Sequence, residues 1–146
     1  MCMQINIDCF KDVLKYCVDN IDYEEDGNSW NIKCVNLSMM YESPDLKYGK
    51  KDIMRSVLKL DECGFIKIFS KFPENKPYLD RCSIEDVTFR GYQFIESVRE
   101  PSVWKKTKVI ASKVGNHTLG FIESVAHDVA VEASKAAINT IMWENV

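Results

Sequence analysis

Apolar side chains recur at intervals of three and four residues in six segments of the chain, and this spacing predicts six helices. The predicted helices cover residues 8–20, 38–41, 49–63, 88–98, 101–114 and 118–142. Short polar side chains stand where several of them begin, and such side chains can accept a hydrogen bond from a free backbone N–H group. We therefore expect Asp8 and Ser38 to cap the first two helices, and Thr88 or Asp86 to cap the fourth.

Three further segments alternate between apolar and polar residues, which is typical of β-strands. They cover residues 29–37, 65–72 and 81–89. In the first strand, Trp30, Ile32 and Cys34 are expected to face the core, and the acidic residues 23–28 before it are predicted to form a turn. The last two strands enclose a polar loop with two prolines, so they are expected to pair as a β-hairpin.

The predicted order is helix, strand, helix, helix, strand, strand and then more helices, which is the order of a winged helix-turn-helix. The fold class that we expect is mainly α with a small antiparallel β-sheet. Residues 1–100 would form the winged helix-turn-helix domain, and residues 101–146 would form a C-terminal helical extension.

The predicted helix at residues 49–63 carries a row of cations. Lys51, Arg55 and Lys59 follow one another at i, i+4 and i+8 and therefore share one face. We expect the opposite, inner face to consist of Ile53, Met54, Val57, Leu58 and Leu60. Gly64 directly after the helix suits a left-handed C-cap. In helix-turn-helix proteins the helix at this place enters the major groove, where an arginine can pair with guanine for about 1–3 kcal/mol of discrimination.

Cations in the loops beside this helix enlarge the candidate DNA-binding site, because the predicted hairpin could reach the phosphate backbone next to the groove. The candidate residues are Lys47, Lys50, Lys51, Arg55, Lys59, Lys71, Lys76 and Arg81. The same cations could instead form an ordinary solvated helix face, which Glu62 shares. A second basic group, at Lys105, Lys106, Lys108 and Lys113, either extends the surface or solvates its own helix.

The charge of the chain is unevenly distributed around a net value of −3. Residues 8–26 hold seven acidic side chains against two lysines, whereas residues 47–59 are mostly basic. The separation favours one positive working face, and double-stranded DNA is the partner that this face would bind. The overall acidity favours an alternative, in which the protein binds and blocks another protein, such as a host nuclease or defence component.

Little in the sequence indicates catalysis or a bound cofactor. The six cysteines include no CxxC pair, and the two histidines stand far from any close cysteine pair, so we expect neither disulfides, metal nor cofactor. His127 and Asp128 are adjacent but would point about 100° apart on a helix. Without a catalytic motif, an export signal or a long apolar run, we expect a cytoplasmic protein that is neither an enzyme nor a membrane protein.

The last predicted helix has small residues along its apolar side. Ala126, Ala130 and Ala133 would let another helix approach closely. That helix could belong to a second copy, giving a homodimer through residues 118–142, or to the same chain. The sequence leaves both possibilities open.

Two stretches resemble a known family. VLKLDECGFI resembles the Leu-Leu-x-x-Ala-Gly-Leu-Ile segment of the small phage and prophage proteins catalogued as domain of unknown function 2513. DVTFRGYQFIESVREPSVWKKTK resembles that family's Leu-Thr-x-x-Gly-x-x-Phe-Leu run with its Val-Trp and basic tail. The matching residues are Val87, Thr88, Gly91, Phe94, Ile95, Val103, Trp104 and Lys105. Phe89, Tyr92 and Ser56 depart from the family's usual Trp, His and His. The resemblance implies a winged-helix fold and a mobile-element origin, but no defined biochemical role.

Overall fold

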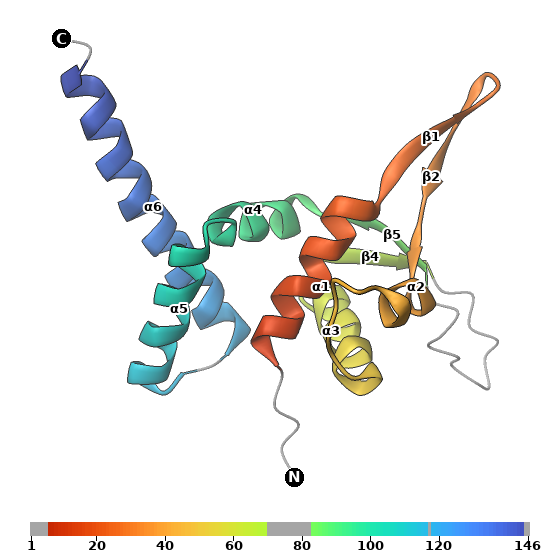
Figure 1. Ribbon diagram of the computed structural model, residues 1–146, viewed down its shortest axis with the longest axis horizontal. Coiled ribbons are helices and arrows are strands. Elements are labelled where there is room, and N and C mark those ends of the chain that lie inside the picture. Colours follow the sequence, from red (N-terminus) through yellow and green to blue (C-terminus); the bar gives the residue numbers. More distant parts are fainter. Residues whose placement is uncertain (1–5, 70–82, 117, 145–146) are drawn as a thin grey trace. The chain divides into compact units, whose positions relative to one another are not determined.

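The computed structural model describes residues 6–69, 83–116 and 118–144, and it divides the chain into two compact units (Figure 1). The first unit is Met1–Tyr92 and the second is Gln93–Val146. The helices are α1 (Ile7–Asn20), α2 (Leu37–Glu42), α3 (Lys50–Glu62), α4 (Phe89–Val98), α5 (Pro101–Val114) and α6 (Leu119–Glu144). The strands are β1 (Asp22–Asp26), β2 (Ser29–Lys33), β3 (Val35–Asn36), β4 (Ile66–Phe69) and β5 (Ser83–Val87). The predicted class, mainly α with a small antiparallel β content, is confirmed.

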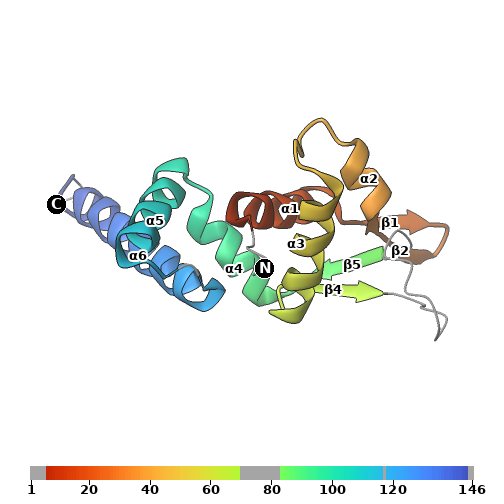
Figure 2. The same ribbon diagram turned by 90° about the horizontal axis from the view of Figure 1, so that it is seen from below.

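The core of the first unit lies between α1, α3 and a small sheet. Figure 2 shows α1 lying across α3, and the two helices contact each other along their apolar sides. Phe10 of α1 meets Phe65 edge to face, with ring centres 5.8 Å apart. Ile53, Val57 and Leu60 of α3 are buried, as the helical spacing predicts.

The sheet of this core has three antiparallel strands in the order β3-β5-β4. β5 lies in the middle, pairing Ile84 with Val35 on one side and Val87 with Ile66 on the other. A register shift between Lys67 and Ile68 interrupts the second ladder. The predicted pairing of the strands around residues 65–72 and 81–89 is confirmed for their described parts.

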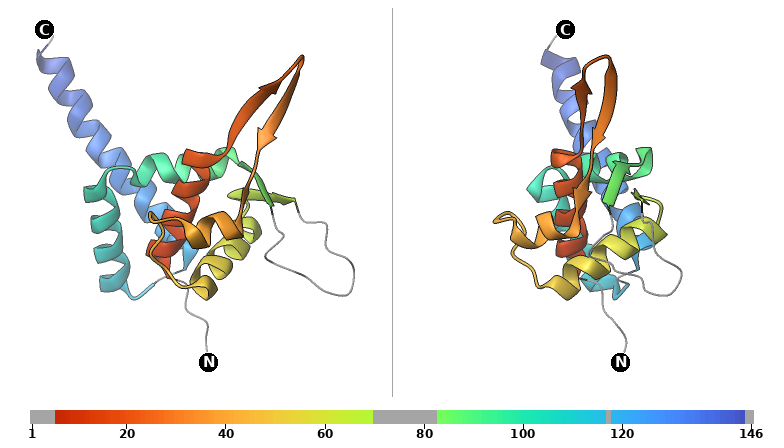
Figure 3. Two further views of the ribbon diagram at one scale, coloured as in Figure 1. Left: turned by 45° about the vertical axis from the view of Figure 1, so that its right-hand side comes forward. Right: turned by 90° about the vertical axis from the view of Figure 1, so that its right-hand side faces the viewer.

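A second sheet was not expected from the sequence. β1 and β2 form a two-stranded antiparallel hairpin, which stands out from the helices of the first unit (Figure 3). The acidic residues 23–28 were predicted to be a turn, but most of them form β1, and only Gly27 and Asn28 turn the chain. The predicted strand 29–37 is confirmed as extended chain but not as one strand, because it divides into β2, which is exposed, and the short β3, in which Val35 is buried. Trp30 and Ile32 are consequently exposed, not part of the core.

Two predicted helix caps are wrong by two residues. The Oδ1 atom of Asn6 accepts the bond from the Cys9 N–H group, so α1 begins before Asp8. Asn36 likewise accepts from the Met39 N–H group, in place of Ser38. An asparagine caps as well as an aspartate or serine, and in both helices the earlier residue has the extended backbone that a cap requires.

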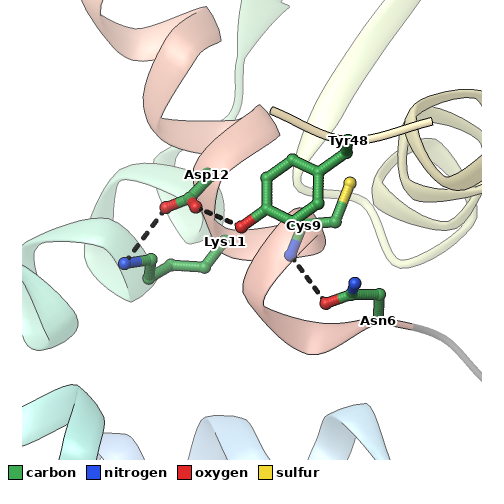
Figure 4. A network of polar contacts seen from close by, with 5 residues as sticks. All are labelled: Asn6, Cys9, Lys11, Asp12 and Tyr48. Atoms are coloured by element: carbon green, nitrogen blue, oxygen red, sulfur yellow. Dashed lines mark hydrogen bonds and ion pairs between the residues drawn. The ribbon is translucent and has the colours of Figure 1, made fainter. Parts of the chain in front are cut away.

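A polar network attaches the segment before α3 to α1 (Figure 4). The Tyr48 hydroxyl donates to Oδ2 of Asp12 at 2.6 Å, and Lys11 pairs with the other carboxylate oxygen at 3.1 Å. Burial, followed by the bond to Asp12, raises the pKa of Tyr48 well above its ordinary value. Gly49 follows immediately as the N-cap of α3. The network therefore sets where α3 starts relative to α1.

The second unit consists of α5 and α6, which pack against each other, together with the end of α4. Trp104 is buried and meets Phe94 edge to face at 6.3 Å between ring centres. Gly115 ends α5 with φ 75°. Trp104 and Ala111 belong to the buried side of α5, whereas Val114 at its end is exposed. None of the helices within the described ranges combines the length and apolar character needed to cross a bilayer.

Candidate nucleic-acid interface

The outer face of α3 contains the described part of the candidate site, and it is not wholly basic. Lys51 is exposed and Arg55 is half-buried. Leu58, which was predicted to face inward, is 42% exposed. Seven residues separate Leu58 from Lys51, which places the two side chains only about 20° apart around the helix. We name Lys51, Arg55 and Leu58 the α3 outer face.

Lys59 differs from the other cations of the row. Its ammonium group lies 2.7 Å from Oε2 of Glu62, in an i, i+3 ion pair on the last turn of the helix. A cation at this end also complements the helix dipole. Lys59 therefore has a local structural partner and is less available to a ligand than Lys51.

The first turn of α3 is basic, contrary to the preference of a helix. Lys50 and Lys51 stand there, and Asp52 is the only acid of that turn. The helix dipole disfavours cations at an N-terminus by about 0.3–1 kcal/mol each. Gly49 also provides no side-chain bond to the free N–H groups. Such an end suits a phosphate group, which can accept from backbone N–H groups and pair with both lysines.

The remaining cations of the prediction are distributed on both sides of this turn. Lys47 is exposed in the segment between α2 and α3. The ammonium group of Lys50 lies 5.4 Å from the centre of the Tyr41 ring, a cation–π contact with α2. Lys71, Lys76 and Arg81 lie outside the described residues. The structure thus brings together Lys47, Lys50, Lys51 and Arg55 around the start of α3.

Two basic residues near the end of α3 were not predicted. Lys67 is exposed on β4 opposite Asp86, and the alternation of the strand could have identified it. Arg90 donates to the Cys63 carbonyl at 2.9 Å, and its guanidinium lies 5.1 Å from the Phe65 ring centre. Arg90 therefore caps the C-terminal end of α3.

The second basic group lies in the second unit. Lys105, Lys106 and Lys113 are exposed along α5. The ammonium group of Lys108 lies 5.9 Å from the centre of the Trp104 ring. Lys113 in the last turn complements the dipole of α5. These contacts favour the interpretation that the lysines solvate the outer face of their own helix.

Two cysteine thiols of α1 are buried in the first unit. Burial raises the pKa of the Cys9 thiol, and a bond with the buried Ser56 hydroxyl opposes that rise. Burial raises the pKa of the Cys17 thiol to about 12. Both thiols therefore stay protonated at neutral pH and are poor nucleophiles. Within the described ranges, no three His, Cys, Asp or Glu side chains are placed to hold a metal ion.

These observations define a mainly helical protein with a small antiparallel sheet and a basic helix start on its first unit. Residues 4–118 match the family model described as "Hypothetical protein (DUF2513)", and the chain belongs to this family. No curated protein and no solved structure matches the chain.

The residues that carry the family resemblance are mostly buried. Thr88 begins α4: its Oγ1 accepts from the Gly91 N–H group at 3.2 Å and donates to the Gly64 carbonyl at 2.6 Å. The buried residues among the others are Val87, Gly91, Phe94, Ile95, Val103 and Trp104. The shared pattern thus describes how α4 is packed, and it identifies no reactive site.

Proposed function

We propose that the first unit is a winged helix-turn-helix that binds double-stranded DNA through the α3 outer face and the start of α3. The observation that carries the proposal is the pair of lysines at the N-terminus of α3, where the N-cap Gly49 offers no side-chain bond, cations cost helix stability and a phosphate would compensate them. Lys47 and Arg55 lie on either side of this turn.

The arrangement of the first unit supports this function. α2 and α3 are followed by β4 and β5, and β3 completes the sheet on the far side of β5. In winged-helix proteins the helix corresponding to α3 lies in the major groove. Arg55 would then contact base edges, and Leu58 would contact a thymine methyl group. Lys47 and Lys50 would bind phosphates. A regulatory protein of a phage or prophage would use such a domain to recognise an operator.

The test is direct binding to duplex DNA. Fluorescence anisotropy with a labelled duplex of mixed sequence at low salt should detect binding by the wild-type protein. The double variant Lys51→Ala/Arg55→Ala should bind at least about tenfold more weakly. The matched variant Lys105→Ala/Lys106→Ala removes two cations from α5 and should bind as the wild type does. Equal binding by all three proteins would exclude the α3 outer face.

A homodimer through α6 would give such a protein two half-sites. Beyond residue 131 every described side chain of α6 through residue 143 is exposed. Ile138, Ile141 and Met142 lie at helical spacing on this part of the helix, which carries few charges. Ile138→Glu/Ile141→Glu should convert a dimer to a monomer in sedimentation velocity. A wild-type protein that sediments as a monomer at all concentrations would exclude the dimer.

A further inference from the structure

We propose that one face of the β1–β2 hairpin docks on a basic surface of another protein. The face consists of Tyr23, Trp30 and Ile32 together with Glu25, and we name it the hairpin face. Tyr23 is paired directly with Ile32, and Glu25 with Trp30. Side chains of directly paired residues point to the same side of a sheet, and residues two apart share that side. The four side chains therefore form one continuous surface.

The hairpin face is apolar and open. Tyr23 is 62% exposed, Trp30 67% and Ile32 45%. All ten residues of β1 and β2 are exposed, so the hairpin contributes nothing to the core of the first unit. A two-stranded hairpin is at best marginally stable by itself. Two aromatic rings and an isoleucine on its surface are then unfavourable in water, and a partner that covers them would stabilise the hairpin.

The charges of the hairpin determine the kind of partner. The opposite face carries Asp22, Glu24 and Asp26, and its one cation, Lys33, lies 4.0 Å from Glu24. With Glu25, the hairpin has four carboxylates and a single lysine. This charge repels DNA, anionic membranes and the same hairpin of a second copy. It attracts a basic protein surface.

The hairpin face also indicates which basic residue it would accept. Glu25 stands directly beside the exposed ring of Trp30. An arginine of the partner stacked on this indole can pair with the carboxylate at the same time. The partner would therefore present arginine and aliphatic side chains together. This inference does not depend on DNA binding by α3, because the two surfaces differ in charge and in residues.

A cationic apolar peptide is the simplest probe of this surface. A fluorescein-labelled peptide of alternating Arg and Leu should bind the full-length protein at low salt. Peptides of alternating Arg and Ser, or of alternating Glu and Leu, should bind at least about tenfold more weakly, because each lacks one of the two features. An Arg-Ser peptide that binds as tightly as the Arg-Leu peptide would show charge attraction alone and would overturn the proposal.

Substitutions in the hairpin then test whether the peptide binds at the hairpin face. Tyr23→Ser/Trp30→Ser should weaken binding of the Arg-Leu peptide at least about tenfold. The control Ser29→Ala/Asn31→Ala changes the opposite face and should leave the affinity unchanged. Because the first variant could unfold the hairpin, Glu24→Gln/Glu25→Gln keeps the aromatic rings and should lower both the affinity and its salt dependence. Binding that survives both Tyr23→Ser/Trp30→Ser and Glu24→Gln/Glu25→Gln would overturn the proposal. Self-association of the wild type that Tyr23→Ser/Trp30→Ser abolishes would assign the face to a second copy and would overturn it as well.

Discussion

Gly91 in the first turn of α4 packs directly against the backbone carbonyl of Phe65, just after the end of α3. A Cβ atom at Gly91 would overlap that carbonyl and would lie 2.8 Å from Cγ1 of Val87. The same carbonyl accepts from the Thr88 N–H group at 2.9 Å. The start of α4 is therefore fixed against the end of α3 by backbone contacts that leave no room for a side chain.

Gly91→Ala should destabilise the protein, because neither the carbonyl nor β5 can move without breaking the sheet. Overpacking of this kind costs about 1–3 kcal/mol. The measurement is the free energy of unfolding in urea. Gly120→Ala is the matched control, since nothing lies within 4 Å of a Cβ atom at that helical position. The control should be neutral or slightly stabilising. Equal effects of the two substitutions would contradict the contact.

Leu58 and Leu60 offer a second comparison, on a single helix. Leu60 is fully buried, whereas Leu58 is 42% exposed on the α3 outer face. Leu60→Ala should lower the free energy of unfolding by about 2–5 kcal/mol, because it leaves a cavity in the core. Leu58→Ala should lower it by less than about 0.5 kcal/mol. If α3 binds DNA, Leu58→Ala should also weaken binding while the circular dichroism spectrum stays unchanged.

The spacing of apolar residues predicted where the helices lie better than it predicted which side of each helix is buried. It predicted α3 and the burial of Ile53, Val57 and Leu60, because a long amphipathic helix repeats its signal over several turns. The Gly64 C-cap also follows from sequence, since glycine adopts a positive φ without strain. Leu58 was expected to face inward because leucine is apolar, although its angle around the helix is close to that of Lys51.

The hairpin is where sequence reasoning was least successful. Trp30 and Ile32 alternate with polar residues, a pattern that usually indicates a half-buried strand. Alternation fixes that two residues share a face, but not whether anything covers that face. Only the pairing with β1 and the exposed position of both strands show that they are uncovered. A strand that packs in a core and a strand that binds a partner can therefore show the same alternation of apolar and polar residues.

The buried thiol of Cys17 should make the free energy of unfolding decrease at alkaline pH. Burial raises its pKa from 9.0 to about 12 in the folded protein. Below pH 9 the thiol is protonated in both states, so it makes no difference. Above that pH the unfolded chain loses the proton and the folded one keeps it, so the free energy of unfolding falls as the pH rises. At one pH unit above the unfolded value the loss is about 1 kcal/mol.

Cys17→Val removes this contribution. Unfolding in urea at neutral pH and at pH 10 should show that the wild type loses about 1 kcal/mol more than the variant. The comparison concerns the change with pH, so a different absolute stability of the variant does not affect it. Burial and Asp12 raise the pKa of Tyr48 in the same direction, so the variant should retain part of the alkaline loss. Identical losses in both proteins would show that Cys17 is not shielded from water.

The salt dependence of DNA binding should rank the cations of α3. Each lysine or arginine that neutralises a phosphate releases counterions, so its removal lowers the slope of log affinity against log salt by about 0.9. Lys51→Ala should reduce the slope by this amount, because the side chain is exposed at the first turn. Lys59→Ala should change it little, because Glu62 already lies 2.7 Å from the ammonium group.

Glu62→Gln tests whether Lys59 contributes little because of its ion pair or because of its position at the end of α3. The substitution releases Lys59 from its ion pair and should increase the slope if Lys59 can then reach the backbone of the DNA. Arg55→Ala should weaken binding to one preferred sequence more than to mixed duplex, since a base contact adds discrimination to affinity. Slopes that are equal for Lys51→Ala and Lys59→Ala would mean that DNA approaches the end of α3 as closely as its start.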